Sequence, residues 1–264
     1  MEKLEMQMLT STGFRLSESY KVIRSNLLFL GSDIKAIVFT SSVQNEGKST
    51  VSWNLAISLA ESGKSVLFVD ADMRKSVFMA KHRVKTNPNG LSHFLSGQKN
   101  LNEVIYMTEQ DNLFIMPPGP VPPNPAELLS KPLFEEAVQS LKKTFDYIII
   151  DAPPISATTD PAIIASVCDG TVMVIGAKRS SAKMIKEGLE LLERTGKPIL
   201  GSILNMVDYK YFSGGYERYY GKRYGYGYGY GYGYGYGYGS YYGHSKDKDK
   251  EKDKEKNTSK EDKQ

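Results

Sequence analysis

The sequence predicts an α/β fold in which helices flank a mostly parallel β-sheet, followed by a disordered tyrosine-rich C-terminal tail. Over the first 208 of the 264 residues, short apolar runs typical of buried strands alternate with runs typical of helices. Strands that alternate with helices favour parallel pairing with right-handed crossovers. We expect the strands at residues 36–40, 65–69, 112–116, 147–150, 171–175 and 199–204.

The charge distribution argues against nucleic acid as a partner, and the cysteine content indicates a reducing compartment. The formal net charge is +4, and residues 209–264 contain 12 Lys or Arg and 8 Asp or Glu, which leaves 22 of each sign before them. A neutral folded region argues against nucleic acid as a partner. The single cysteine, Cys168, lies in an apolar run, which predicts a buried thiol in a reducing cytoplasmic compartment. Neither a membrane-spanning run nor a signal peptide is expected.

The chain is predicted to have three segments. Residues 1–208 form one globular domain, residues 209–245 a Tyr/Gly-rich segment and residues 246–264 a solvated mixed-charge segment. Fifteen tyrosines lie between positions 209 and 242, eight of them in consecutive Tyr-Gly units. Because glycine at alternate positions disfavours a stable helix or strand, we expect disorder there. A sticky low-complexity segment or an RNA-stacking tail are alternative interpretations.

A loop of sequence SSVQNEGKST follows the first strand and precedes a helix-like run. Its Gly47, Lys48 and Ser49 match the end of the phosphate-binding consensus G-x-x-x-x-G-K-[ST], whereas Ser42 replaces the first glycine. Backbone N–H groups and a helix N-terminus directed at anionic oxygens make such a loop a phosphate site. The pattern predicts a P-loop NTPase fold.

Carboxylates follow two of the apolar runs directly. Asp70 and Asp72 come after the second strand, and Asp151 comes after the strand at 147–150. Ligands of parallel sheets bind at the carboxyl ends of the strands, and Asp151 matches the magnesium-associated carboxylate of phosphate-loop proteins. Helix capping by Asp70 or Asp72 is the alternative interpretation.

Two helices are predicted from capping and spacing. Ser17 is the expected N-cap of an amphipathic helix at residues 17–30, and Asn124 the expected N-cap of a single helix that runs to about Lys143. Two histidines, His82 and His93, are interpreted as ordinary polar residues and not as metal ligands.

Three motifs in this order, together with the tail, resemble the bacterial tyrosine kinases of capsule and exopolysaccharide loci. The Gly-Lys-Ser loop, Asp70-x-Asp72-x-Arg74 and Asp151-x-Pro-Pro correspond to the Walker A, A′ and B motifs of that family. The similarity covers residues 14–242. It implies an ATP-dependent protein-tyrosine autokinase that phosphorylates its C-terminal tyrosines in trans between subunits and regulates capsule or exopolysaccharide synthesis and export.

The resemblance implies roles for individual residues. Lys48 would bind the β- and γ-phosphates, and Thr50 would contact the α-phosphate side. Asp70 would accept the tyrosine proton, and Asp72 would share or orient that role. The catalytic set is therefore Lys48, Asp70 and Asp72. The expected ATP- and phosphate-binding residues are Gln44, Asn45, Glu46, Gly47, Lys48, Ser49, Thr50, Arg74 and Asn205, with Asn205 assigned to adenine and Arg74 to phosphate or loop ordering.

The resemblance also implies Mg²⁺, bound with ATP as the substrate. Ser49 would ligate the ion, Asp70 would help to hold its coordination shell, and Asp151 would hold a magnesium-bound water. The expected phosphate acceptors are Tyr216, Tyr219, Tyr220, Tyr224, Tyr226, Tyr228, Tyr230, Tyr232, Tyr234, Tyr236, Tyr238, Tyr241 and Tyr242.

Assembly is implied by a family motif of Glu, two residues, Arg, two residues, Arg. Here it reads Glu18, Lys21 and Arg24, where lysine loses the bidentate geometry of arginine. From pattern alone, this stripe is also interpretable as a solvated helix face. The implied partners are identical subunits in a ring, a separate transmembrane activator of the polysaccharide co-polymerase type, which recruits the cytoplasmic kinase to the inner membrane face, and a phosphotyrosine phosphatase.

The alternative function is a MinD/ParA-like ATPase without kinase activity, because that class shares the fold. Those proteins carry a lysine near the start of the loop, whereas this chain has Ser41 and Ser42 there. Iron–sulfur relatives of the same fold need cysteines that this sequence does not contain.

Overall fold

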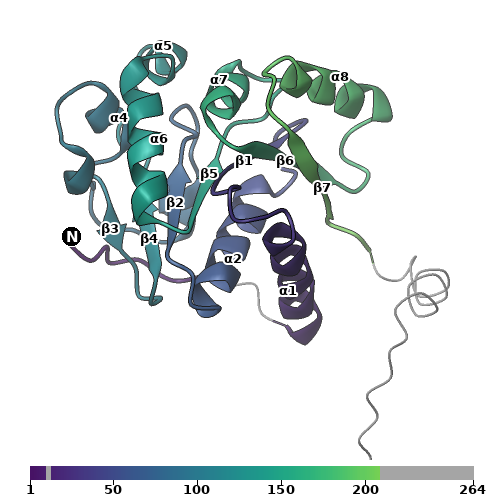
Figure 1. Ribbon diagram of the computed structural model, residues 1–264, viewed down its shortest axis with the longest axis horizontal. Helices are drawn as coiled ribbons and strands as arrows, with labels where there is room; N and C mark the ends of the chain where they lie inside the picture. Colours follow the sequence, from purple (N-terminus) through teal and green to yellow (C-terminus); the bar gives the residue numbers. More distant parts are fainter. Residues whose placement is uncertain (10–12, 209–264) are drawn as a thin grey trace, which may run out of the picture. The chain divides into compact units, whose positions relative to one another are not determined.

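The computed structural model describes residues 1–9 and 13–208, and the α/β fold with a mostly parallel sheet is confirmed (Figure 1). Seven strands form one sheet in the order β3-β4-β2-β5-β1-β6-β7, in which only the β3–β4 pair is antiparallel. The strands are β1 (Ala36–Ser41), β2 (Val66–Asp70), β3 (Tyr106–Met107), β4 (Leu113–Met116), β5 (Tyr147–Asp151), β6 (Gly170–Gly176) and β7 (Ile199–Asn205). The helices are α1 (Phe14–Leu28), α2 (Lys48–Glu61), α3 (Phe78–Lys81), α4 (Leu91–Leu95), α5 (Pro125–Leu129), α6 (Pro132–Thr144), α7 (Asp160–Val167) and α8 (Ala182–Glu193), with a 3₁₀ turn at Leu101–Glu103.

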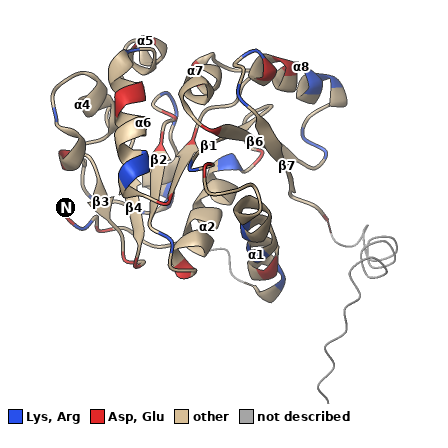
Figure 2. Ribbon diagram, viewed as in Figure 1, with Lys and Arg blue, Asp and Glu red and all other residues tan. Residues whose placement is uncertain are grey.

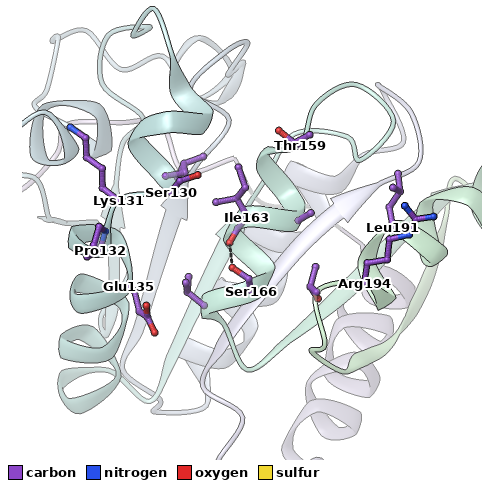
Figure 3. Close-up of a pocket in the computed structure, with 13 residues that line it drawn as sticks. Ser130, Lys131, Pro132, Glu135, Thr159, Ile163, Ser166, Leu191 and Arg194 are labelled. Atoms are coloured by element: carbon purple, nitrogen blue, oxygen red, sulfur yellow. Dashed lines mark hydrogen bonds between the residues drawn. The ribbon is translucent and has the colours of Figure 1, made fainter.

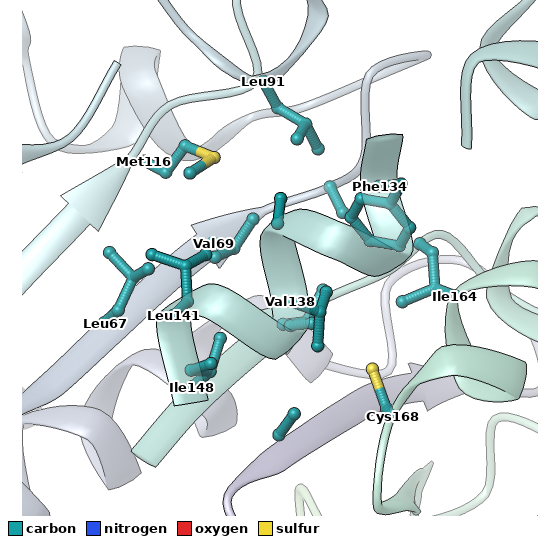
Figure 4. Close-up of a cluster of buried hydrophobic side chains, with 14 of the residues drawn as sticks. Leu67, Val69, Leu91, Met116, Phe134, Val138, Leu141, Ile148, Ile164 and Cys168 are labelled. Carbon is teal, nitrogen blue, oxygen red and sulfur yellow. The ribbon is translucent and has the colours of Figure 1, made fainter. Parts of the chain in front are cut away.

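Helices cover both faces of the sheet, and this explains the continuous apolar runs of the central strands. In β5, Ile148 and Ile150 pack with α6 and α7 on one face, whereas Ile149 packs with α1 and α2 on the other. Successive strand residues point to opposite faces, so a strand covered on both sides has no polar position. Figure 4 shows the α6 side of this core, where Cys168 is fully buried as predicted.

Parallel register aligns the carboxyl ends of the central strands. Phe39 of β1 and Asp70 of β2 both pair with Asp151 of β5. The loop after β1 and the two aspartates therefore meet at one edge of the sheet, as the sequence predicted.

Two predicted helix boundaries were wrong. The first helix begins at Phe14, with Gly13 instead of Ser17 at the N-cap position. The predicted helix at 124–143 is two helices, because Pro132 removes a backbone N–H and favours extended backbone at Lys131, whose φ and ψ are −70° and 145°. Asn124 does precede the first of them, but its side chain donates to Glu127 at 3.1 Å and forms no cap.

The sequence-based expectations for the tail concern residues 209–264, which lie outside the described part of the chain. Within residues 1–9 and 13–208, no helix is both long and apolar enough to cross a membrane.

Candidate active site

The loop between β1 and α2 adopts a tight turn without the first consensus glycine. Asn45 has φ 63° and Gly47 has φ 86°, both in the left-handed region. Asparagine tolerates that region because its side chain bonds locally, and glycine enters it without steric cost. A Cβ atom on Gly47 would also clash with Asn205 Nδ2, so the Asn205 side chain would have to shift to accommodate any other residue there.

Replacing Gly47 by alanine should therefore lower the free energy of unfolding by about 1–3 kcal/mol, since it combines backbone strain with overpacking. Urea unfolding of the variant and the wild type measures the difference. The double variant Gly47→Ala/Asn205→Ala should recover only part of the loss, because it removes the clash and leaves the positive φ. Complete recovery would contradict the argument from backbone strain.

Two residues assigned to the nucleotide use their side chains to hold the loop. The carboxylate of Glu46 is fully buried and accepts hydrogen bonds from Val43 N, Gly176 N and Ser180 Oγ at 2.9, 2.9 and 2.7 Å. Asn205 Nδ2 donates to the Glu46 carbonyl at 2.9 Å. These contacts fix the loop against the ends of β6 and β7, and they leave the backbone of Glu46 as the part that can contact phosphate.

Three carboxylates surround Lys48 at the mouth of the loop. Lys48 Nζ lies 3.4 Å from Asp72 Oδ2 and 3.4 Å from Asp151 Oδ2. Asp70 adjoins this pair on β2, where its two oxygens accept from Asp72 N at 3.2 Å and from Ser76 Oγ. The structure thus brings together the predicted catalytic residues and the carboxyl end of β5.

Burial sets the electrostatics of this cluster. Burial and the neighbouring Asp151 raise the pKa of Asp70 to about 7, although the hydrogen bond from Ser76 opposes the shift. Burial also raises the pKa of Asp151. For Lys48 burial disfavours the charge, but the carboxylates of Asp151, Asp72 and Asp70 outweigh it and raise the pKa. One lysine therefore balances three buried acids, and additional positive charge would stabilise the site.

The cluster fits a magnesium ion whose remaining coordination positions are filled by phosphate oxygens. Asp151 Oδ1 is buried without a hydrogen-bond partner. Burial raises the pKa of this carboxyl, and Lys48 and the nearby Ser49 hydroxyl only partly oppose that shift. Among the described residues, no three His, Cys, Asp or Glu side chains are arranged to hold a metal by themselves. Mg²⁺ commonly binds one or two protein oxygens together with substrate phosphates and waters, so this donor set suits it.

Arg74 is held by a residue that sequence reasoning did not assign to the site. Its Nε and Nη2 donate to Asp160 at 2.7 and 2.9 Å, which is a bidentate pair with a fully buried carboxylate. This contact fixes the segment after β2 to the start of α7. In the sequence, Asp160 stands directly before Pro161 and indicates only the start of a helix, since nothing there links positions 86 residues apart.

A cleft of about 640 Å³ is lined by nine of the predicted site residues: Gln44, Asn45, Gly47, Lys48, Ser49, Thr50, Asp72, Arg74 and Asp151. Glu46, Asp70 and Asn205 lie behind its walls. Its walls also include residues that the motifs do not mark, namely Lys75, Ser76, Val77, Phe78, Lys81, His82, Thr158 and Met206. A cavity of about 610 Å³ lies elsewhere, between the α5–α6 connection and helices α7 and α8 (Figure 3). Ile163 and Ser166 line that cavity and bond to each other, and no motif residue contributes to it.

The residues of the predicted assembly motif lie on α1. Glu18 and Lys21 are largely exposed and pair with each other at 2.7 Å. Arg24 instead faces α2 within the subunit, where Nη1 donates to the Ser58 carbonyl at 2.6 Å and to Ser58 Oγ at 3.2 Å. Phe14 and Val22 expose 82% and 59% of their surface on the same helix, so α1 presents apolar as well as charged side chains.

Comparisons with known proteins agree with this site. The family model of the AAA domain matches residues 34–201. The chain is 41% identical over 209 residues to the tyrosine-protein kinase CpsD of Streptococcus agalactiae, which covers 79% of this chain and 91% of the relative. The crystal structure of the chimerical protein CapA2B2 superimposes with a TM-score of 0.69 at 34% identity, over 72% of this chain and 84% of that one.

A more distant match is a structure determined with a bound nucleotide. The septum site-determining protein MinD of Pyrococcus horikoshii, complexed with Mg-ADP, matches with a TM-score of 0.56 at 29% identity, over 65% of this chain and 70% of that one. This TM-score is lower than the 0.69 of the CapA2B2 structure, which indicates the same fold in a more distant relative. With its ATP-binding P-loop domain, the chain belongs to the CpsD/CapB-like family of bacterial tyrosine-protein kinases.

Proposed function

We propose that this kinase transfers the γ-phosphoryl group of Mg-ATP to tyrosines in the C-terminal segment of a neighbouring subunit, and that it serves capsule or exopolysaccharide synthesis. The observation that carries the proposal is the position of Lys48 between Asp72 and Asp151, next to Asp70, at the wall of the cleft. Phosphoryl transfer depends mainly on positioning and on charge neutralisation, and this arrangement supplies both.

In this mechanism Lys48 exchanges its carboxylate contacts for β- and γ-phosphate oxygens, and the loop N–H groups and Thr50 bind the remaining phosphates. Ser49, Asp151 and Asp70 are the residues that would hold Mg²⁺. When bound, the ion neutralises charge on the transferred group. Arg74, fixed by Asp160, orders the segment beside the phosphates. Asn205 uses one N–H of its side-chain amide to hold the loop, and its assignment to adenine stays a prediction.

Asp70 accepts the proton of the acceptor hydroxyl, and Asp72 orients this region. A tyrosine has a reference pKa of about 10, so a nearby base assists its attack. Asp70 lies at the end of β2 and its carboxyl has a pKa raised to about 7, which makes it a better proton acceptor than an ordinary carboxylate. The hydroxyl of Ser76 donates to this carboxylate and orients it.

Transfer in trans is testable with two variants of the full chain. One carries Lys48→Met and keeps all its tyrosines, and the other keeps Lys48 but has phenylalanine at the 13 acceptor positions. After mixing with Mg-ATP, phosphotyrosine should appear on the Lys48→Met chain, resolved by a size tag. Signal that never appears on that chain, although the wild type labels itself, would restrict transfer to one subunit.

Assembly through α1 is part of the proposal, and Lys21→Glu should weaken it. The substitution reverses an exposed charge beside Glu18, so the cost to the isolated helix is only about 0.3–0.5 kcal/mol. Native mass spectrometry at matched concentrations should show fewer of the large, ring-like homo-oligomers. Lys186→Glu on α8 makes the same change within another exposed helical pair and should leave assembly intact. Equal effects of both variants would argue against the α1 interface.

Tail phosphorylation should act in the same direction. Each phosphotyrosine adds about −1.5 to −2 charges, so a few would reverse the small positive charge of the tail and weaken assembly. A separate transmembrane activator of the polysaccharide co-polymerase type would bring the cytoplasmic kinase to the inner membrane face, and a phosphotyrosine phosphatase would reset it. If native mass spectrometry gave the same oligomer with and without phosphate, charge-driven release would be excluded.

Two rival functions have weaker support. A MinD/ParA-like ATPase would hydrolyse ATP without labelling tyrosine, and here Ser41 and Ser42 occupy the positions where that class carries its lysine. For a nucleic-acid-binding role, the described helices α6 and α8 offer no uniformly basic surface, since each carries both signs of charge (Figure 2). Phosphotyrosine immunoblotting after incubation with Mg-ATP separates the kinase from both rivals, and release of inorganic phosphate without labelling separates the ATPase from the nucleic-acid-binding protein.

A further inference from the structure

We propose that Lys81 is a second phosphate-contacting lysine of the nucleotide site, acting on the Thr50 side of the loop. The inference deepens the proposed function and rests on its nucleotide-binding step. Neither the loop consensus nor the two carboxylate motifs include this residue.

The contact that carries the proposal joins α3 to the first turn of α2. Lys81 Nζ lies 2.7 Å from Thr50 Oγ1, and both residues line the 640 Å³ cleft. Thr50 is the third residue of a 14-residue helix whose N-terminus follows Gly47, so an anion bound there lies against its N–H and hydroxyl groups. An ammonium group in contact with that hydroxyl is within reach of the same anion.

Packing holds Lys81 in this place. The neighbouring Phe78 stacks on His82 with ring centroids 4.1 Å apart, and Trp53 of α2 meets both rings edge-on at 4.9 and 5.2 Å. A ring nitrogen of His82 also bonds to the Gln7 carbonyl at 2.9 Å. The single turn of α3 is thereby fixed to α2, and Lys81 extends from a rigid base. Positioning of this kind reduces the entropy lost on binding.

The charge of Lys81 is less satisfied than that of the motif lysine. Lys48 is shared by two carboxylates, and Arg74 is paired with Asp160. Among the described residues, no carboxylate forms an ion pair with Lys81, and partial burial lowers its pKa. A phosphate oxygen would supply the missing counter-charge. Lys48 and Lys81 would then contact the phosphate chain from two sides of the first turn of α2.

The test measures binding of Mg-ADP and Mg-ATP to the full chain by isothermal titration calorimetry. Lys81→Met should weaken binding of both nucleotides by about ten- to hundredfold, the effect of one charge-assisted hydrogen bond. Lys81→Arg should retain most of the affinity because it keeps the charge. Lys85→Met removes an exposed lysine four residues away, outside the cleft walls, and should bind like the wild type. In autophosphorylation, Lys81→Met should raise KM for ATP and leave kcat within about twofold.

The binding data decide whether Lys81 contacts the phosphates of the nucleotide. Loss of affinity in Lys81→Met with an unchanged thermal midpoint, together with recovery in Lys81→Arg, supports the contact. Wild-type affinity in Lys81→Met, or equal loss in Lys81→Met and Lys85→Met, overturns it. Weakening of ATP alone would overturn the placement beside Thr50, because Lys81 would then contact only the terminal phosphate. A wild-type chain that binds nucleotide but labels no tyrosine would refute the kinase mechanism and leave this measurement valid.

Discussion

Replacing Lys48 by methionine should lower tyrosine autophosphorylation by more than about 100-fold, because a pre-positioned charge that stabilises the transferring group is lost. In the structure, the ammonium group is the one cation in contact with both Asp72 and Asp151 among the described residues. Methionine keeps the length and the apolar packing of the side chain. Quantitative phosphotyrosine immunoblotting with Mg-ATP, at nucleotide concentrations well above KM, measures the loss.

The control is Lys85→Met, which removes the same charge at an exposed site outside the cleft and should leave labelling unchanged. Circular dichroism and a thermal melt of both variants separate catalysis from folding. The Lys48→Met chain should remain folded, because its side chain can still pack at the start of α2. Labelling that survives this substitution would refute the assignment of the loop as the catalytic phosphate site.

Much of the fold could be predicted because its signals are local. The run at 147–150 is apolar at every position, and this indicates a strand covered on both faces, as β5 is. Asp70 and Asp151 lie side by side because they end two neighbouring parallel strands, and the sequence pattern is sufficient to predict this. The break at Pro132 was also encoded locally, but the amphipathic spacing on both sides of it favoured one helix, and that interpretation was wrong.

The remaining features of the site depend on packing between distant segments. From the sequence, Glu46 is expected to be a loop residue near phosphate. In the structure its carboxylate accepts hydrogen bonds from Gly176 and Ser180, which are 130 and 134 residues away in the chain. The contact between Lys81 and Thr50 depends on how α3 docks on α2 through aromatic rings. No periodicity or motif encodes such distances, so a sequence reading locates the loop and the carboxylates and misses the side chains that position them.

Replacing Asp70 by asparagine should abolish transfer and at the same time stabilise the protein. Asparagine keeps an oxygen that can accept from Asp72 N and an amide that can donate to Ser76 Oγ, so the local hydrogen bonds persist. It removes a buried charge whose pKa is raised to about 7 mainly by burial and by Asp151. We expect the free energy of unfolding at pH 8 to rise by about 1–2 kcal/mol, because removal of poorly compensated buried charge is often stabilising.

The sign of the pH dependence gives a sharper test of the same idea. The folded pKa of Asp70 lies above its unfolded value of 3.8, so the native state binds more protons between about pH 4 and 7. The contribution of Asp70 to stability therefore falls as pH rises through that window, and Asp70→Asn should remove this fall. The matched variant Asp160→Asn should instead destabilise the protein by about 1–2 kcal/mol, since it removes the bidentate partner of Arg74, whose side chain is partly exposed. Thermal unfolding of the three proteins between pH 4 and 8 measures both effects, and a destabilised Asp70→Asn at pH 8 would show that its carboxylate is better compensated than the surrounding charges indicate.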